Sequence, residues 1–243
     1  MNLTCQYQCL ETFYWGFSVK NSIRYNAGMH FSTLFFDLDA TLYPASSGLW
    51  EQIRLRIFRY MREEVGIPEE LIPETRDKYW KTYGTTLEGL RIHHQTDPDH
   101  YLKYVHDISM MDYLEPDPEL QKLLTSLPQE LWIFTNADHR HAKNVLNTLG
   151  IADCFSGIVD LIAMDFQVKP RPDSYQTALK MAGESDPAHC VLFDDLIQNL
   201  LPAKKMGFTT SLVGEIGKTD GVDYYLDSIH DIQNMMPQLW SGK

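Results

Sequence analysis

The chain has 243 residues, enough for one large hydrophobic core or for a core with a small accessory domain. Its 21 Lys and Arg residues against 33 Asp and Glu residues give a formal net charge of −12, and a protein this acidic repels the phosphate backbone of nucleic acids. We therefore expect no nucleic-acid polymer among its partners. A small anionic substrate is compatible with this charge, because a metal ion or a few local cations can override the field of the whole molecule.

The N-terminal segment and the cysteines bear on location. Residues 1–28 contain aromatic residues around Trp15 but no preceding basic stretch, so they predict neither a signal peptide nor a membrane span, and no other segment does. We expect this segment to be a disordered or spurious extension, with Met29 as an alternative start. Scattered cysteines without a CxxC pair indicate a reducing compartment and no zinc site, so we expect a cytoplasmic protein without a membrane partner; they are Cys5, Cys9, Cys154 and Cys190.

Short apolar runs recur after Met29, and most of them stop at a polar residue. Runs that are apolar throughout predict strands buried on both faces, as in a parallel sheet. The run at 34–36 stops at Asp37, the run at 131–134 stops at Thr135, and the run at 190–193 stops at Asp194. Further strands are predicted at 209–213 and around 222–225.

Helices are predicted between these strands, and most of them end at a glycine, the residue that favours a helix C-terminus. They cover residues 138–149, 174–182, 196–206 and 229–237. The repeated order of strand, polar residue, helix and glycine predicts an α/β fold with a doubly wound, Rossmann-like parallel sheet. In such sheets ligands bind at the carboxyl ends of the strands, which is where the polar residues lie.

Residues 47–117 interrupt this alternation, because they contain no clear strand. Apolar residues recur at helical spacing from Trp50 to Val65, and further helices are predicted at 69–81, 86–92 and 100–109. We interpret 47–117 as an inserted all-helical cap that lies over the site. The α/β core then consists of residues 29–46 and 118–243.

Asp37 and Asp39, at the end of the first strand, suit the hydrolysis of a phosphate ester. This reaction needs a nucleophile, a proton donor for the leaving alcohol and positive charge near the phosphoryl oxygens. Asp37 would attack phosphorus and form an aspartyl-phosphate, and Asp39 would act as the acid and then as the base. Two carboxylates this close repel each other, so a cation must share the site, and oxygen ligands favour Mg²⁺.

The later strand ends supply the remaining groups. Thr135 and its neighbours offer a hydroxyl and N–H groups for phosphate, Lys169 offers a positive charge, and Asp194 and Asp195 offer another metal carboxylate. Each has a simpler interpretation alone: a DxD pair is common on surfaces, Thr135 or the acidic pair can cap a helix, and Lys169 can be solvated. Their common position after strands favours the joint functional interpretation.

These motifs resemble those of the haloacid dehalogenase superfamily from about Met29 to the end of the chain. The four corresponding segments are Asp37-Leu38-Asp39-Ala40-Thr41, Phe134-Thr135, Lys169-Pro170 and Phe193-Asp194-Asp195. The insertion after the first strand matches a type of cap found in that family. The resemblance implies an aspartyl-phosphate mechanism with Mg²⁺.

Other segments resemble the pyrimidine 5′-nucleotidase subgroup. They are Asp39-Ala40-Thr41-Leu42-Tyr43-Pro44, residues 83–90, Phe134-Thr135-Asn136-Ala137-Asp138 and residues 221–225. This resemblance implies UMP or CMP as substrates, while relatives acting on other small phosphate esters, such as sugar phosphates, leave that alternative open. We expect a monomer or a homodimer that binds a mononucleotide.

The resemblance also implies individual roles. Asp37 is the nucleophile and a metal ligand, and Asp39 is the acid/base and binds the metal through its main-chain carbonyl. Thr135, Asn136 and Lys169 bind phosphate, while Asp195 ligates the metal with support from Asp194. Two departures from the family pattern are Ala40, where Asp, Asn or Gly is usual, and Leu196, where Ser is often found.

Candidate residues for substrate selection lie in the insertion: Tyr83 offers an aromatic face for a base, and Thr85 and Thr86 offer hydroxyls for its edge. The alternative is that these threonines only cap a helix. A metal site at His93 and His94, or at His139 and His141, is not expected, because clustered surface histidines are common.

Three rival functions remain to be weighed. A dehalogenase needs no acid for a leaving alcohol, so Asp39 argues against it. A phospho-aspartate receiver module also uses an acidic cluster, a Thr and a Lys on a doubly wound sheet, but in a different order and without a long insertion. A catalytically idle relative is disfavoured because Asp37, Asp39, Lys169 and Asp195 are all present.

Overall fold

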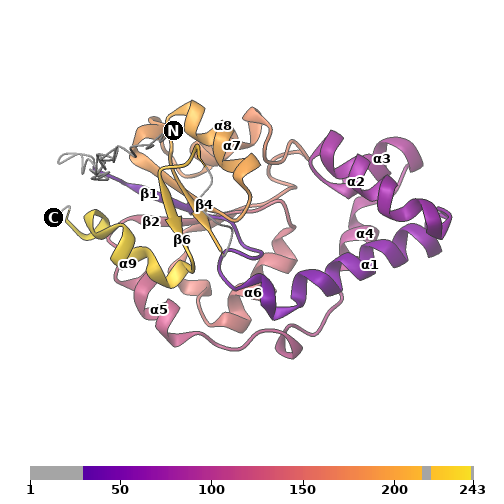
Figure 1. The fold of residues 1–243 in the computed structure, drawn as a ribbon, viewed down its shortest axis with the longest axis horizontal. Helices are drawn as coiled ribbons and strands as arrows, with labels where there is room; N and C mark the ends of the chain where they lie inside the picture. The colour runs from indigo at the N-terminus through magenta and orange to yellow at the C-terminus, as the bar shows by residue number, and fades with distance from the viewer. Residues whose placement is uncertain (1–29, 215–219, 242–243) are drawn as a thin grey trace, which may run out of the picture.

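The computed structural model describes residues 30–214 and 220–241 (Figure 1). The predicted extension at 1–28, with Cys5 and Cys9, lies outside these residues. The strands form one six-stranded sheet in the order β3-β2-β1-β4-β5-β6, and every neighbouring pair is parallel. This confirms the predicted doubly wound α/β fold. In the described part of the chain, no helix combines the length and the apolar character needed to cross a membrane.

The strands lie close to where the apolar runs predicted them. Their bounds are β1 Thr33–Phe36, β2 Glu130–Phe134, β3 Gly157–Val159, β4 Cys190–Asp194, β5 Thr209–Val213 and β6 Tyr224–Leu226. Strand β3 was not predicted, because it has three residues, lies at the sheet edge and is only partly buried. Gly157 is required there, since a Cβ atom would lie 2.3 Å from the ring of Trp132 on β2.

Four helices of the α/β part lie between consecutive strands in the chain, and α9 follows the last strand. They are α5 Pro118–Thr125, α6 His139–Leu149, α7 Pro172–Met181, α8 Ile197–Met206 and α9 Ile232–Met235. Helix α6 begins after Asp138, whose side chain accepts hydrogen bonds from the backbone N–H groups of Arg140 and His141. The single helix predicted at 229–237 is wrong, because the chain there forms the 3-10 turns Ile229–Asp231 and Pro237–Trp240 on either side of the short α9.

Within residues 47–117 the structure has helices and 3-10 turns but no strand. The helices are α1 Leu49–Glu63, α2 Ile72–Tyr83, α3 Thr86–His94 and α4 Pro98–Val105, and Figure 1 shows them together beside one end of the sheet. The apolar stripe of α1 is buried, including Ile53, Ile57 and Met61. Helix α4 starts two residues earlier than predicted, because Asp97 caps it and Pro98 occupies its first turn.

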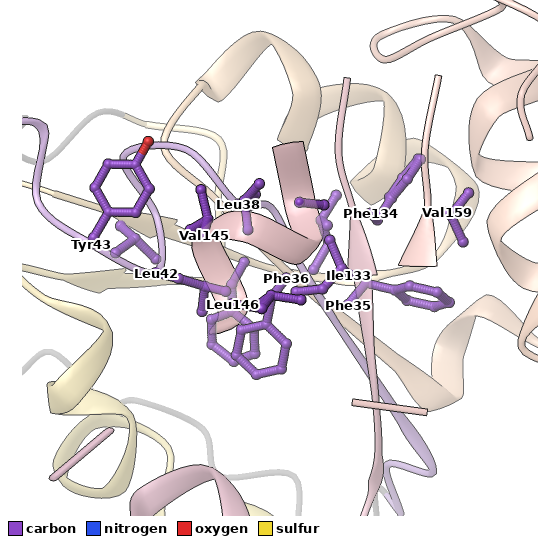
Figure 2. Packing of buried hydrophobic residues seen from close by; sticks show 14 of the residues in the cluster. Phe35, Phe36, Leu38, Leu42, Tyr43, Ile133, Phe134, Val145, Leu146 and Val159 are labelled. Atoms are coloured by element: carbon purple, nitrogen blue, oxygen red, sulfur yellow. The ribbon is translucent and has the colours of Figure 1, made fainter. Parts of the chain in front are cut away.

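The core is built around β1, whose four residues are all buried between β2 and β4. Phe36 stacks on Phe193 of β4 at 4.8 Å between ring centroids, and Phe35 meets Phe134 of β2 edge to face at 6.1 Å. Figure 2 shows Phe35, Phe36 and Phe134 in this core, with Val145 of α6 among the buried residues. Each such side chain contributes about 1.5–3 kcal/mol by burial, so the end of β1 is a rigid support for the residues that follow.

Candidate active site

The residues that follow β1, β2 and β4 meet at the carboxyl edge of the sheet. Asp37 directly follows β1, and its backbone N–H donates to the carbonyl of Phe193 on β4 over 2.8 Å. Asp37 is buried, with 8% of its surface exposed. The Thr41 hydroxyl donates a hydrogen bond to Asp37 Oδ2 over 3.3 Å.

Lys169 lies beside the buried carboxylates of Asp37 and Asp194 and offsets part of their negative charge. Its ammonium donates to Asp37 Oδ1 over 2.9 Å and to Asp194 Oδ2 over 2.6 Å, and its side chain is fully buried. Burial alone would lower the pKa of Lys169, but Asp194 and Asp37 raise it above its ordinary value, so the side chain is charged. Asn136 holds the Lys169 backbone with two hydrogen bonds, of 2.9 and 3.0 Å.

Asp37, Asp194 and Asp195 form an acidic cluster whose carboxylate oxygens lie within 4.8 Å of one another. Burial, opposed by Lys169 and reinforced by Asp194, raises the pKa of Asp37 to about 7. Burial and the charge of Asp37 raise the pKa of Asp195 to about 8. Negative charge is therefore costly here, and a divalent cation with oxygen ligands such as Mg²⁺ fits the cluster.

The two acidic residues after β4 have different surroundings. The carboxylate of Asp194 accepts hydrogen bonds from the backbone of Leu196 and the side chains of Asn199 and Lys169. Asp195 instead lines a cavity together with Asp37. Asp194 is therefore occupied by neighbouring donors, whereas Asp195 faces the space in which a metal would lie; that Asp195 ligates the metal directly stays a prediction. Leu196, which departs from the family pattern, still donates a hydrogen bond from its backbone N–H to Asp194.

Asp39 has contacts unlike those of Asp37. Its Oδ1 atom accepts from the Tyr43 hydroxyl over 2.6 Å and lies 2.7 Å from His141 Nε2. Burial would raise the pKa of Asp39, but the charge and hydrogen bond of His141 lower it below its ordinary value. Ala40 adopts a left-handed backbone conformation with φ of 61°, which costs an alanine about 1–2 kcal/mol and which Asp, Asn or Gly would tolerate better.

The histidine beside Asp39 was not expected in the site. The sequence analysis grouped His141 with His139 as surface residues, but His141 is fully buried and only His139 is exposed. Its ring stacks on that of His106 from the insertion, with centroids 4.3 Å apart, and His106 Nδ1 lies 2.6 Å from Asp138 Oδ2. The signal was available, because position 141 shares a helical face with the buried residues Ala142, Val145, Leu146 and Leu149.

A cavity of about 360 Å³ joins the acidic cluster to the insertion. The sheet side contributes Asp37, Asp39, Thr135, Asn136 and Asp195. The insertion contributes aromatic and apolar side chains with one cation, including Trp50, Ile53, Arg76, Trp80, Tyr101 and His106. The candidate catalytic residues and the helical insertion therefore face the same space.

The candidate residues for substrate selection divide between lining and non-lining positions. Thr85 and Thr86 line the cavity, and Thr85 also caps α3 by accepting from the Glu88 backbone over 3.2 Å. Tyr83 is not among the lining residues, and its hydroxyl lies 2.8 Å from His93 Nε2. Thr135 lines the cavity, and its hydroxyl accepts from the Ala137 backbone over 3.0 Å. It does not cap α6, whose N-cap is Asp138.

Comparisons with known proteins agree with this geometry. A family model described as haloacid dehalogenase-like hydrolase matches residues 31–207. Phosphate metabolism protein 8 of Saccharomyces cerevisiae is 32% identical over 187 residues, which are 71% of this chain but only 58% of the length of that relative.

Solved structures show the same fold. The Bacillus subtilis hydrolase YfnB, bound to magnesium, superposes with a TM-score of 0.59 at 14% identity, over 84% of this chain and 98% of that one. The L-2-haloacid dehalogenase of Xanthobacter autotrophicus superposes with a TM-score of 0.55 at 17% identity, over 87% of this chain and 99% of that one. At such identities the likeness concerns the fold.

Proposed function

The chain belongs to the haloacid dehalogenase-like hydrolases, and we propose that it is a magnesium-dependent phosphomonoesterase that acts through an aspartyl-phosphate on Asp37. The observation that carries the proposal is the pairing of two unlike carboxylates in one cavity. Asp37 is held by Lys169, whereas Asp39 is held by Tyr43 and His141. A halide leaves without a proton, so the second carboxylate supports an ester with an alcohol leaving group over a halide.

The reaction would take place in two displacements. A carboxylate oxygen of Asp37 forms a bond to phosphorus as the ester P–O bond breaks, and Asp39 gives a proton to the leaving alcohol oxygen. Water then attacks phosphorus, Asp39 takes a proton from it, and the bond between phosphorus and Asp37 breaks. The lowered pKa of Asp39 suits the second step, and the negative charge of a bound phosphate raises that pKa toward what the first step needs.

The side chains of Asp37 and Asp195 and the main-chain carbonyl of Asp39 would hold Mg²⁺, with Asp194 supporting them. When bound, the ion supplies positive charge to the phosphoryl oxygens. Lys169 adds the charge of its buried ammonium beside Asp37, and Thr135 and Asn136 complete the proposed phosphate site. The raised pKa values of Asp37 and Asp195 support a cation at this cluster.

For the substrate we propose a pyrimidine mononucleotide, UMP or CMP. Support comes from the sequence resemblance and from the cavity, where Trp50, Trp80 and Tyr101 offer faces for a planar base and Arg76 offers a donor. Thr85 and Thr86 line the same cavity, and we propose that they contact the leaving group. A sugar phosphate would use the same catalytic residues but would gain little from these aromatic side chains. For the setting we propose the cytoplasm, with the protein as a monomer or homodimer.

A phosphate-release screen with Mg²⁺ tests both levels of the proposal. The panel contains mononucleotides, sugar phosphates and small phosphate esters, each tested with the parent and with Asp37→Asn. We expect UMP and CMP to be hydrolysed fastest and the variant to be inactive. If the parent releases phosphate from no ester faster than the variant, the phosphatase proposal is wrong. If sugar phosphates are clearly preferred, only the nucleotide assignment is wrong.

A further inference from the structure

The carboxylate of Asp39 is hydrogen-bonded at one oxygen and, within the described residues, has no hydrogen bond at the other. Among the residues that the structure describes, both hydrogen bonds to this side chain end on Oδ1, from the Tyr43 hydroxyl at 2.6 Å and from His141 Nε2 at 2.7 Å. Asp39 lines the cavity. Two donors on Oδ1 fix the plane and direction of the carboxyl group, and Oδ2 is left to exchange a proton.

The two donors to Asp39 come from different parts of the fold. Tyr43 is four residues away in the same loop, whereas His141 comes from α6, on the far side of β2 in the sequence. Asp39 offers a carboxylate oxygen, which accepts, so the proton of the His141 ring lies on Nε2. His141 is fully buried in the first turn of α6, so its backbone is held by the α/β core and not by the loop that carries Asp39.

The ring of His141 is itself fixed from the insertion. His106 stacks on it with ring planes 21° apart, and Asp138, the N-cap of α6, binds His106 Nδ1 at 2.6 Å. Asp138 therefore anchors both the helix that carries His141 and the ring that covers it. A side chain with its ring stacked, its helix capped and its Nε2 bonded has few other orientations.

We propose that His141 is a positioning residue that holds Asp39 in the geometry for proton transfer to the leaving alcohol. Proton transfer requires the donor within hydrogen-bond reach of the leaving oxygen, and small displacements are costly. The inference rests on the proposed phosphatase function, in which Asp39 is the acid. It adds a residue outside the four sequence motifs and gives the stacked pair of histidines a part in the chemistry.

The leaving group distinguishes this role from a purely structural one. A nucleoside alcohol needs a proton as it departs, whereas nitrophenolate departs without one. The measurement is kcat/KM for UMP and for p-nitrophenyl phosphate, because this ratio reports the steps up to formation of the aspartyl-phosphate. His141→Phe keeps a ring but loses the donor, and His141→Gln keeps a donor near the position of Nε2. His139→Gln, two residues earlier and exposed, is the matched control.

We expect the loss of kcat/KM in His141→Phe to be about tenfold or more larger for UMP than for p-nitrophenyl phosphate. This difference is a fraction of the total effect of an acid catalyst. His141→Gln should recover most of the difference, and His139→Gln should match the parent. If His141→Phe does not fold, as judged by its thermal transition, His141→Asn replaces it, because the shorter amide does not reach Oδ1.

Equal losses for both substrates in a folded variant, or no recovery with His141→Gln, would overturn the inference. Neither result bears on the phosphatase proposal, which depends on the parent enzyme. A parent that releases phosphate from no ester of the screening panel would instead refute the phosphatase proposal.

Discussion

Removing the charge of Lys169 is expected to destabilise the protein strongly, and more so at high pH. Lys169→Met keeps an unbranched side chain of similar length but leaves Asp37 and Asp194 buried without their common counter-ion, which now lies 2.9 and 2.6 Å away. Breaking a buried ion pair by removing one partner costs about 3–5 kcal/mol. For a chain of this size that loss lowers the midpoint of thermal unfolding by roughly 6–20 °C.

The pH dependence follows from Asp37. Its folded pKa, about 7, is above the ordinary 3.8, and Lys169 is a contact that holds it down. Without Lys169 the folded state binds a proton more tightly than the unfolded state, so stability falls as pH rises from about 4 toward the folded pKa. Protonated Asp37 needs no counter-ion. The loss caused by the substitution should therefore be smaller at about pH 6 than at about pH 9.

Urea unfolding of the parent, Lys169→Met, Asp194→Asn and the double variant measures these effects. Because the two residues share one buried interaction, the double variant should lose less than the sum of the single losses. A Lys169→Met protein within about 1 kcal/mol of the parent at high pH would refute the reasoning, since it would mean that the carboxylates need no buried cation.

Three other changes have defined outcomes. Mg²⁺ should raise the unfolding midpoint more at about pH 9 than at about pH 6. The raised pKa values of Asp37 and Asp195 mean that the metal-free folded state binds protons at the lower pH, and these protons compete with the cation. An equal shift at both pH values would contradict a cation at this cluster. Gly89→Ala should lower the free energy of unfolding in urea by about 1–3 kcal/mol, because the new Cβ would lie 2.2 Å from the ring of Tyr79. An unchanged unfolding midpoint would show that α2 and α3 can separate freely. Trp80→Ala should raise KM for UMP roughly 5- to 150-fold, which corresponds to the free energy of stacking one base on an aromatic side chain. KM for a small ester without a ring should change little. Equal changes for both substrates would argue against base stacking.

The fold and the positions of the candidate catalytic residues at the strand ends could be predicted because their signals are local. The apolar runs that became β1, β2 and β4 are continuous, and the polar residues after them lie at one edge by the geometry of a parallel sheet. The structure accordingly brings Asp37, Lys169 and Asp195 together in one site. Strand β3 was missed because a strand of three residues is too short to show a periodic pattern.

What the sequence did not reveal depends on contacts between distant segments. His106 and His141 meet across 35 positions, and no local pattern marks a buried histidine as the partner of Asp39. The choice of Tyr83 for substrate selection rested on its residue type, whereas its position in α2 turns its hydroxyl to His93. Arg76 and Trp80, one helical turn apart on α2, reach the cavity through the packing of the insertion.

The central claim is that Asp37 carries the phosphoryl group during turnover. A rapid acid quench of the parent with UMP and Mg²⁺, followed by peptide mass spectrometry, tests it most directly. The account predicts a phosphoryl group on the peptide that contains Asp37, absent in Asp37→Asn and formed no later than free phosphate. Release of phosphate at full rate with no phosphorylated peptide at any time, or with the group on another residue, would contradict it.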